Sequence, residues 1–221
     1  MEDFSYAHND TSVPERLSRT ASVNRLRTDE FVAEIRRGAF ARAIPVSSDE
    51  TLQFLMAQAA ACKAENILEI GTAVGVSGIC MLNACGSARL TTIERDENFF
   101  AEAKDNFEKA GLSDRVTQIF GDAGEIIKKL DGEYDFIFLD GAKAQYIKYL
   151  PHLKKLMPSG GVLLADDVLL YGWVNGEAPV PKKRRMLVQH IREYLDAVTR
   201  DDELITSVID VGDGMALSVK R

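Results

Sequence analysis

The chain has 221 residues, of which 46% are hydrophobic, and a formal net charge of −7. This length suits one α/β domain or two small ones, and the apolar content is enough for one sizeable core. The acidic balance disfavours a protein that coats nucleic acid without specificity, although a local basic patch remains compatible with it. No apolar run reaches the roughly 18 residues that span a membrane, and the N-terminus lacks the apolar segment of a signal peptide.

Cysteines and histidines give no sign of a metal or disulfide framework. Cys62, Cys80 and Cys85 are odd in number, lie in apolar surroundings and have no metal-ligand spacing, so we expect buried thiols in a reducing compartment. The three histidines are scattered, which disfavours a zinc site. Together with the missing membrane segment, this composition predicts a soluble cytoplasmic protein.

Helices are expected before the first strand. Residues 14–41 are predicted to form two helical stretches, the second at 28–40. Ser48 precedes two acidic residues and an apolar-periodic run, which predicts a capped helix over 52–62. No linker or repeat follows. We therefore expect a single domain over 1–221, with residues 14–62 as its N-terminal helical cap.

From residue 67 onward, predicted strands alternate with predicted helices. Strands are expected at 67–70, 90–94, 116–120, 136–139 and 162–165, and helices at 76–85, 97–110, 124–130 and 145–157. Such alternation predicts a doubly wound, parallel sheet. A long helix at 182–199 and a hairpin of strands at 204–210 and 215–219 then complete a mostly parallel seven-stranded sheet with a C-terminal antiparallel hairpin. This order resembles the Rossmann-like S-adenosylmethionine (SAM) methyltransferase fold.

A glycine-rich turn follows the first predicted strand. The strand carries Glu69, and glycines follow at Gly71, Gly75 and Gly78 before a helical run. Glycines allow the backbone to approach a ligand closely, and the start of a helix offers unpaired N–H groups. The combination predicts a nucleotide-type site. It is not the dinucleotide fingerprint G-x-G-x-x-G, because Ala73 occupies the position of the second glycine.

Acidic residues stand at or just after the ends of all five parallel strands, and they are Glu69, Glu94, Asp122, Asp140 and the pair Asp166–Asp167. Ligands of doubly wound sheets lie outside the carboxyl ends of the strands. Glu94 follows Gly71 by about 20 residues, the interval at which an acid takes the ribose hydroxyls. A single such acid is often only a solvated strand end, but a whole rim of them indicates a ligand site.

Asp140, Asp166 and Asp167 stand at two predicted strand ends that we expect to be adjacent. Clustered carboxylates repel one another unless a cation or proton intervenes, and oxygen ligands without His or Cys suit Mg²⁺ or a similar ion. The alternative is that one of the aspartates caps a helix or turn. Lys143 follows Asp140 by three residues. A lysine on a turn is usually only solvated, but beside a divalent ion its pKa would be lowered, which suits a proton acceptor.

These residues together resemble the cation-dependent O-methyltransferase family that includes catechol and caffeoyl-CoA O-methyltransferases. The resemblance covers residues 44–221 and rests on the segments 44–51, 68–77, 92–94, 121–123, 139–143 and 165–169. It implies a SAM site formed by Val46, Glu69, Gly71, Thr72, Gly75, Ser77, Glu94, Asp122, Ala123 and Asp140. It also implies metal ligation by Asp140, Asp166 and Asp167, and catalysis by Lys143 as the general base together with Asp140. The family usually has Asn where this chain has Asp167.

Within the family, the chain is most similar to bacterial tRNA 5-hydroxyuridine methyltransferases. The supporting segments are 168–173, the basic run 182–185 and the closing segment 211–219. The resemblance implies Mg²⁺-dependent methylation of the wobble 5-hydroxyuridine in a tRNA anticodon loop. The apolar faces of the predicted N-terminal helices could form a dimer contact, so we expect a homodimer. A catechol or a caffeoyl-CoA-type phenol is the alternative acceptor. A nicotinamide-dependent oxidoreductase and a non-catalytic SAM-binding module are further alternatives.

Overall fold

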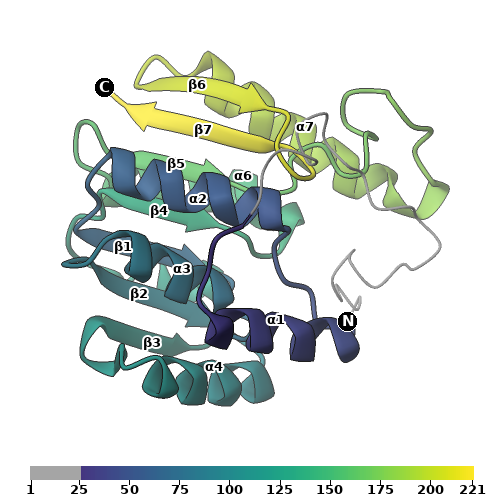
Figure 1. The fold of residues 1–221 in the computed structure, drawn as a ribbon. Helices are drawn as coiled ribbons and strands as arrows, with labels where there is room; N and C mark the ends of the chain where they lie inside the picture. The colour runs from purple at the N-terminus through teal and green to yellow at the C-terminus, as the bar shows by residue number, and fades with distance from the viewer. Residues whose placement is uncertain (1–25) are drawn as a thin grey trace.

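A computed structural model describes residues 26–221 and contains one seven-stranded mixed sheet. The strand order is β3-β2-β1-β4-β5-β7-β6 (Figure 1). The strands are β1 (Asn66–Ile70), β2 (Arg89–Glu94), β3 (Val116–Phe120), β4 (Phe136–Leu139), β5 (Val162–Ala165), β6 (Leu204–Ile209) and β7 (Met215–Lys220). Strands β1 to β5 are parallel, whereas β7 pairs antiparallel with both β5 and β6. The sheet and terminal hairpin predicted from the sequence are confirmed.

Seven α-helices accompany the sheet in the described part of the chain. They are α1 (Glu30–Ala41), α2 (Asp49–Ala61), α3 (Val76–Ala84), α4 (Glu97–Lys109), α5 (Ala123–Ile126), α6 (Tyr146–Leu156) and α7 (Arg185–Arg200). The predicted cap at Ser48 is confirmed, since its hydroxyl accepts a hydrogen bond from the N–H of Thr51 at 3.1 Å. The predicted helix before α1 lies outside the described residues.

Two hydrophobic clusters cover the two faces of the sheet, as the alternation along each strand requires. Ile67 packs in one cluster, which includes residues of α1 to α4. Leu68 and Ile70 pack in the other, which includes residues of α6 and α7. The central strands β4 and β5 are buried at every position, so they lie in the core directly before the acidic residues that follow them.

Three sequence expectations differ from the structure in detail. The predicted helix at 124–130 is only the short α5, and residues 182–184 form a 3₁₀ turn before α7 rather than its first turn. Cys62 is exposed, so the prediction of three buried thiols was wrong for this residue. It is the C-cap of α2, where the chain turns outward, and apolar neighbours in sequence do not bury a helix end.

Candidate active site

Two adjoining cavities lie at the carboxyl ends of the parallel strands. The larger, of about 850 Å³, is within the size range of small-molecule sites, and its lining includes Gly71, Glu94, Asp122, Ala123 and Lys143. The lining of the smaller includes Val46, Gly71, Asp140, Asp166 and Asp167. Gly71 and Asp167 line both cavities, so the glycine turn and the acidic cluster meet where the cavities join.

Gly71 follows β1 and packs closely against the backbone of Asp140, in the segment after β4. Its φ is +99°, and its N–H donates to the carbonyl of Ile93 at 3.1 Å. A Cβ at this position would lie 2.1 Å from the carbonyl oxygen of Asp140. Only glycine accommodates both this conformation and this contact, and the turn therefore brings backbone close to the cavity.

Glu69 lies below the glycine turn and is fully buried. Ser77 donates its hydroxyl hydrogen to Glu69 Oε1 at 2.5 Å, and Thr92 donates to Oε2 at 2.6 Å. Thr72 in turn lies 2.5 Å from the Thr92 hydroxyl. Burial raises the pKa of Glu69 to about 7, although the hydrogen bonds from Ser77 and Thr92 act in the opposite direction.

The residues of the network around Glu69 do not line either cavity. Glu69, Thr72, Gly75 and Ser77 were predicted to contact SAM, yet none of them lines either cavity. Instead, the carboxylate of Glu69 in β1 accepts hydrogen bonds from Ser77 of α3 and Thr92 of β2, and so links the elements on either side of the turn. Their predicted roles at the ligand remain predictions.

Glu94 is held in a single orientation by backbone donors. Its Oε2 accepts from the N–H of Ala73 at 2.9 Å, and its Oε1 accepts from the N–H groups of Arg95 and Asp96, each at 2.8 Å. A carboxylate has about four acceptor sites, so three such bonds leave capacity for a ligand hydroxyl. Because Glu94 lines the larger cavity, its position fits the predicted ribose contact.

Asp122 begins the short helix α5 at the next strand end. Its carboxylate accepts from the N–H of Glu125 at 3.2 Å, so it serves as the N-cap. The residue also lines the larger cavity beside Ala123. The capping role and the predicted role at the adenine are therefore compatible in this one residue.

Asp140, Asp166 and Asp167 come together as the sequence predicted. They follow the neighbouring strands β4 and β5, and each offers a carboxylate oxygen within 4.8 Å of the others. Burial raises the pKa of Asp166 well above its ordinary value, and the nearby Asp167 and Asp140 add to that shift. Crowded carboxylate oxygens with incompletely balanced charge are a suitable donor set for a hard divalent cation.

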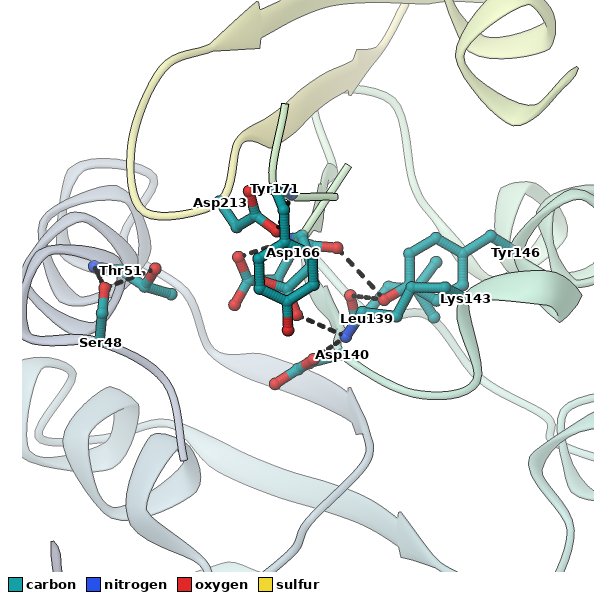
Figure 2. Close-up of polar contacts among 10 residues, drawn as sticks. Ser48, Thr51, Leu139, Asp140, Lys143, Tyr146, Asp166, Tyr171 and Asp213 are labelled. Atoms are coloured by element: carbon teal, nitrogen blue, oxygen red, sulfur yellow. Dashed lines mark hydrogen bonds and ion pairs between the residues drawn. The ribbon is translucent and has the colours of Figure 1, made fainter. Parts of the chain in front are cut away.

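Lys143 pairs with two of these carboxylates (Figure 2). Its Nζ lies 2.6 Å from Asp140 Oδ1 and 2.9 Å from Asp167 Oδ2. Burial favours the neutral amine, but the negative charges of Asp140 and Asp167 outweigh burial and raise the pKa of Lys143 well above its ordinary value. With these carboxylates alone Lys143 is an ammonium, so the predicted base requires that their charge be shared with a cation.

Tyr171 and Asp213 lie at the junction of the cavities and line both. Sequence reasoning missed Asp213, and it used Tyr171 only as part of the segment 168–173. Asp213 belongs to the turn between β6 and β7, which the sequence identified only as a hairpin connection. An acid between two glycines near the C-terminus was a signal, but its contact with a loop 42 residues earlier is tertiary. Lys183 and Arg184 of the basic run also line the larger cavity.

Comparisons with known proteins agree with this geometry. The family model described as O-methyltransferase matches residues 21–221. A catechol O-methyltransferase of Niastella koreensis is 35% identical over 189 residues, which cover 81% of this chain and 83% of that protein. A caffeoyl-CoA O-methyltransferase of Populus kitakamiensis is 29% identical over 182 residues, which cover 79% of this chain and 76% of that protein.

Solved structures show the same architecture. The O-methyltransferase of Bacillus cereus in complex with SAH has a TM-score of 0.78 and 26% identity, and the match covers 91% of this chain and 95% of that one. The O-methyltransferase TomG of Streptomyces achromogenes, in complex with SAM, has a TM-score of 0.79 and 26% identity, with 90% and 93% covered. No helix among residues 26–221 is both long and apolar enough to cross a membrane.

Proposed function

Since this chain belongs to the O-methyltransferase family and is a SAM-dependent enzyme, we propose that it methylates a phenolic hydroxyl of a small catechol-type acceptor with the help of a divalent cation. The observation that carries the proposal is the junction of the two cavities. There Asp167 and Gly71 line both cavities, and Lys143 lies within ion-pair distance of Asp140 and Asp167. Donor, cation and acceptor would meet at this junction.

The donor side of the site consists of the glycine turn and the carboxylate of Glu94. We infer that the turn at Gly71 admits the methionine end of SAM, while Glu94 accepts hydrogen bonds from the ribose hydroxyls. Asp122 and Ala123, on the same wall of the larger cavity, would lie beside the adenine. Rigid placement matters because transfer requires the acceptor oxygen, the methyl carbon and the sulfur to lie in line.

The acceptor side consists of the three aspartates and Lys143. When bound by Asp140, Asp166 and Asp167, a divalent cation would supply Lewis acidity that lowers the pKa of an acceptor hydroxyl. Lys143 would take up the hydroxyl proton once the carboxylate charge that keeps it protonated is shared with the cation. An O–CH₃ bond then forms as the C–S bond breaks, and the products are the methyl ether, S-adenosylhomocysteine and one proton.

Asp167 is the residue at which this chain departs from the family resemblance. Relative to asparagine it adds one negative charge to a site that already holds two carboxylates. We infer that this charge strengthens binding of a divalent cation, because hard oxygen anions are the preferred ligands. Titration of D167N with Mn²⁺ tests this inference, and an affinity equal to that of the wild type would contradict it.

Incubation with labelled SAM, Mg²⁺ and a panel of catechols tests the proposed function. We expect methyl transfer to catechols, loss of transfer with EDTA, and much weaker transfer to phenols that lack a neighbouring oxygen. Transfer that is equally fast in EDTA would contradict the role of the cation. A lack of transfer to every catechol would contradict the acceptor.

The tRNA wobble 5-hydroxyuridine remains a second candidate acceptor, because Lys183 and Arg184 line the larger cavity and basic side chains suit phosphates. The similarity to a catechol O-methyltransferase fits the small phenol better. The triple variant K183A/R184A/R185A and the acceptor preference of the wild type together distinguish a tRNA acceptor from a catechol acceptor. A wobble-tRNA enzyme would lose tRNA methylation in this variant while its SAM affinity stayed unchanged. A catechol enzyme would prefer catechols to wobble-hydroxylated tRNA even as the wild type.

Two further expectations accompany this function. A homodimer is predicted from the apolar faces of the N-terminal helices, and light scattering of the purified protein measures the oligomeric state directly. A nicotinamide-dependent oxidoreductase is disfavoured by the family membership and by the terminal hairpin, since β7 runs antiparallel to β5.

A further inference from the structure

The turn between β6 and β7, residues 211–214, contacts two segments that line the smaller cavity. On one side, the N–H of Gly212 donates to Glu50 Oε2 at 3.1 Å, at the start of α2. On the other side, the N–H of Val168 donates to the carbonyl of Gly214 and the N–H of Leu169 to the carbonyl of Asp213, each at 2.9 Å. The last turn of the chain therefore bridges the N-terminal helices and the loop after β5.

Asp213 adds a side-chain contact to this bridge. Both of its carboxylate oxygens lie 2.7 Å from the backbone nitrogen of Tyr171, which donates to them. Three N–H groups of one short loop, those of Val168, Leu169 and Tyr171, are thus bound by two adjacent residues of the turn.

This loop, residues 167–171, has an uncommon backbone conformation. Asp167, Leu170 and Tyr171 have φ values of +56°, +46° and +58°. Residues other than glycine rarely adopt such values, because their Cβ then crowds the backbone carbonyl, and the conformation persists only where surrounding contacts hold it. The hydrogen bonds from the turn are contacts of this kind.

The turn also packs directly against the loop. Gly214 has a φ of +85°, and a Cβ there would lie 2.2 Å from Cγ of Leu169. The turn and the loop are thus in direct contact at this point.

The loop carries two groups to the junction of the cavities. Asp167 offers one of the three clustered carboxylates and pairs with Lys143. Tyr171 extends from its contact with Asp213 toward Asp140 and Lys143, as Figure 2 shows, and it lines both cavities. The positions of Asp167 and Tyr171 depend on the backbone conformation of this loop, and Asp213 contacts that loop through the N–H of Tyr171.

We propose that Asp213 is a positioning residue, which holds the loop 167–171 in its left-handed conformation and thereby places Asp167 for cation binding and Tyr171 beside the acceptor. The part that concerns the acceptor rests on the proposed function. The part that concerns the cation rests on the cation site of that function, whereas the part that concerns the loop depends only on the hydrogen bonds and backbone angles of this structure.

Two substitutions at Asp213 should weaken its contact with the loop to different extents. D213A removes both acceptor oxygens, whereas D213N keeps one and removes the charge. We expect at least 10-fold faster hydrogen exchange of the amides of residues 168–171 in D213A, and a smaller increase in D213N. The dissociation constant for Mn²⁺ should rise about 10-fold or more in D213A, as it does when groups that orient metal ligands are lost. The affinity for SAM should change less than about threefold.

D202A is the matched control, because Asp202 is an exposed acid that precedes the same hairpin. It removes the same charge, and we expect wild-type exchange and Mn²⁺ affinity. Thermal unfolding of each variant separates a local effect from a global one. If D213A fails to fold, hydrogen exchange and Mn²⁺ affinity are compared between D213N and the wild type instead. D213N should fold, since one oxygen still accepts from the N–H of Tyr171.

Unchanged exchange of residues 168–171 together with unchanged Mn²⁺ affinity in D213A would overturn the proposal. So would a loss of Mn²⁺ affinity that D202A reproduces. These readouts need no acceptor. If the wild type methylates no catechol but its loop exchange and Mn²⁺ affinity depend on Asp213, then the proposed function fails and the positioning role stands.

Discussion

Lys143 Nζ and Asp140 Oδ1 lie 2.6 Å apart, in a pair whose side chains are only 10% and 23% exposed. The carboxylate predicted to bind the cation is therefore also a partner of the predicted base. Any cation that takes the charge of Asp140 weakens the interaction that keeps Lys143 protonated. Cation binding and proton transfer are thus coupled through this contact.

Removal of the Lys143 amine should abolish most of the methyl transfer. K143M keeps the length and apolar stem of the side chain but has no group that accepts a proton. We expect kcat to fall by about 100-fold or more, the usual contribution of a general base. Calorimetry with SAM should give an affinity near that of the wild type. Activity within threefold of the wild type would exclude Lys143 as the base.

The D166N substitution should increase the stability of the fold and weaken cation binding. The pKa of Asp166 is raised well above its ordinary value by burial and by Asp167 and Asp140, so its ionised form is less favourable in the fold than in the unfolded chain. Asparagine removes that charge and retains an oxygen that can accept from the N–H of Asp167. In EDTA we expect D166N to be about 1 kcal/mol more stable than the wild type.

The same variant should bind Mn²⁺ at least 10-fold more weakly, because it lacks one of the three carboxylates. Denaturant titration in EDTA and Mn²⁺ titration measure the two effects. If D166N were less stable than the wild type in EDTA and bound Mn²⁺ equally well, Asp166 would be neither a destabilising charge nor a cation ligand.

G71A should impair SAM binding. Its Cβ would lie 2.1 Å from the carbonyl oxygen of Asp140, and alanine is disfavoured at a φ of +99°. The steric overlap and the unfavourable backbone angle should each displace the turn from the cavity. We therefore expect at least a 10-fold loss of SAM affinity by calorimetry. G86A is the matched control, because nothing lies within 4 Å of a Cβ at Gly86. Equal affinity in both variants would show that the turn does not approach SAM.

E69Q should make the stability less dependent on pH. Glu69 binds its proton more tightly in the fold than in the unfolded chain, since burial raises its pKa from 4.5 to about 7. Its contribution to stability is therefore present below pH 4.5 and is lost as the pH rises toward 7. This loss amounts to about 3 kcal/mol, at 1.36 kcal/mol per pKa unit.

Denaturant titrations of the wild type and E69Q between pH 5 and pH 8 check this prediction. Other acids titrate equally in both proteins, so the difference between them isolates Glu69. We expect that difference to shift in favour of E69Q as the pH rises. A constant difference would show that Glu69 is already ionised throughout the range.

Local patterns in the sequence determined the order of elements and the acidic rim of the site. Strands such as β4 and β5 are short apolar runs, and their period and flanking turns do not depend on distant residues. Because parallel strands end at one edge of a sheet, the alternation of strands and helices predicted that Asp140 and Asp166–Asp167 share one rim, and the pairing of β4 with β5 brings their carboxylates together.

Tertiary structure decided which of these residues line the cavities and what holds them. Glu69 and Ser77 share one sequence motif with Gly71, yet they lie below the turn, because Glu69 and Ile67 point to the face opposite to Leu68 and Ile70. The contact between Asp213 and Tyr171 joins residues 42 positions apart, and it depends on the pairing of β7 with β5. A sequence shows the residue types along each strand, but the partner of a loop far along the chain follows only from how the strands pair.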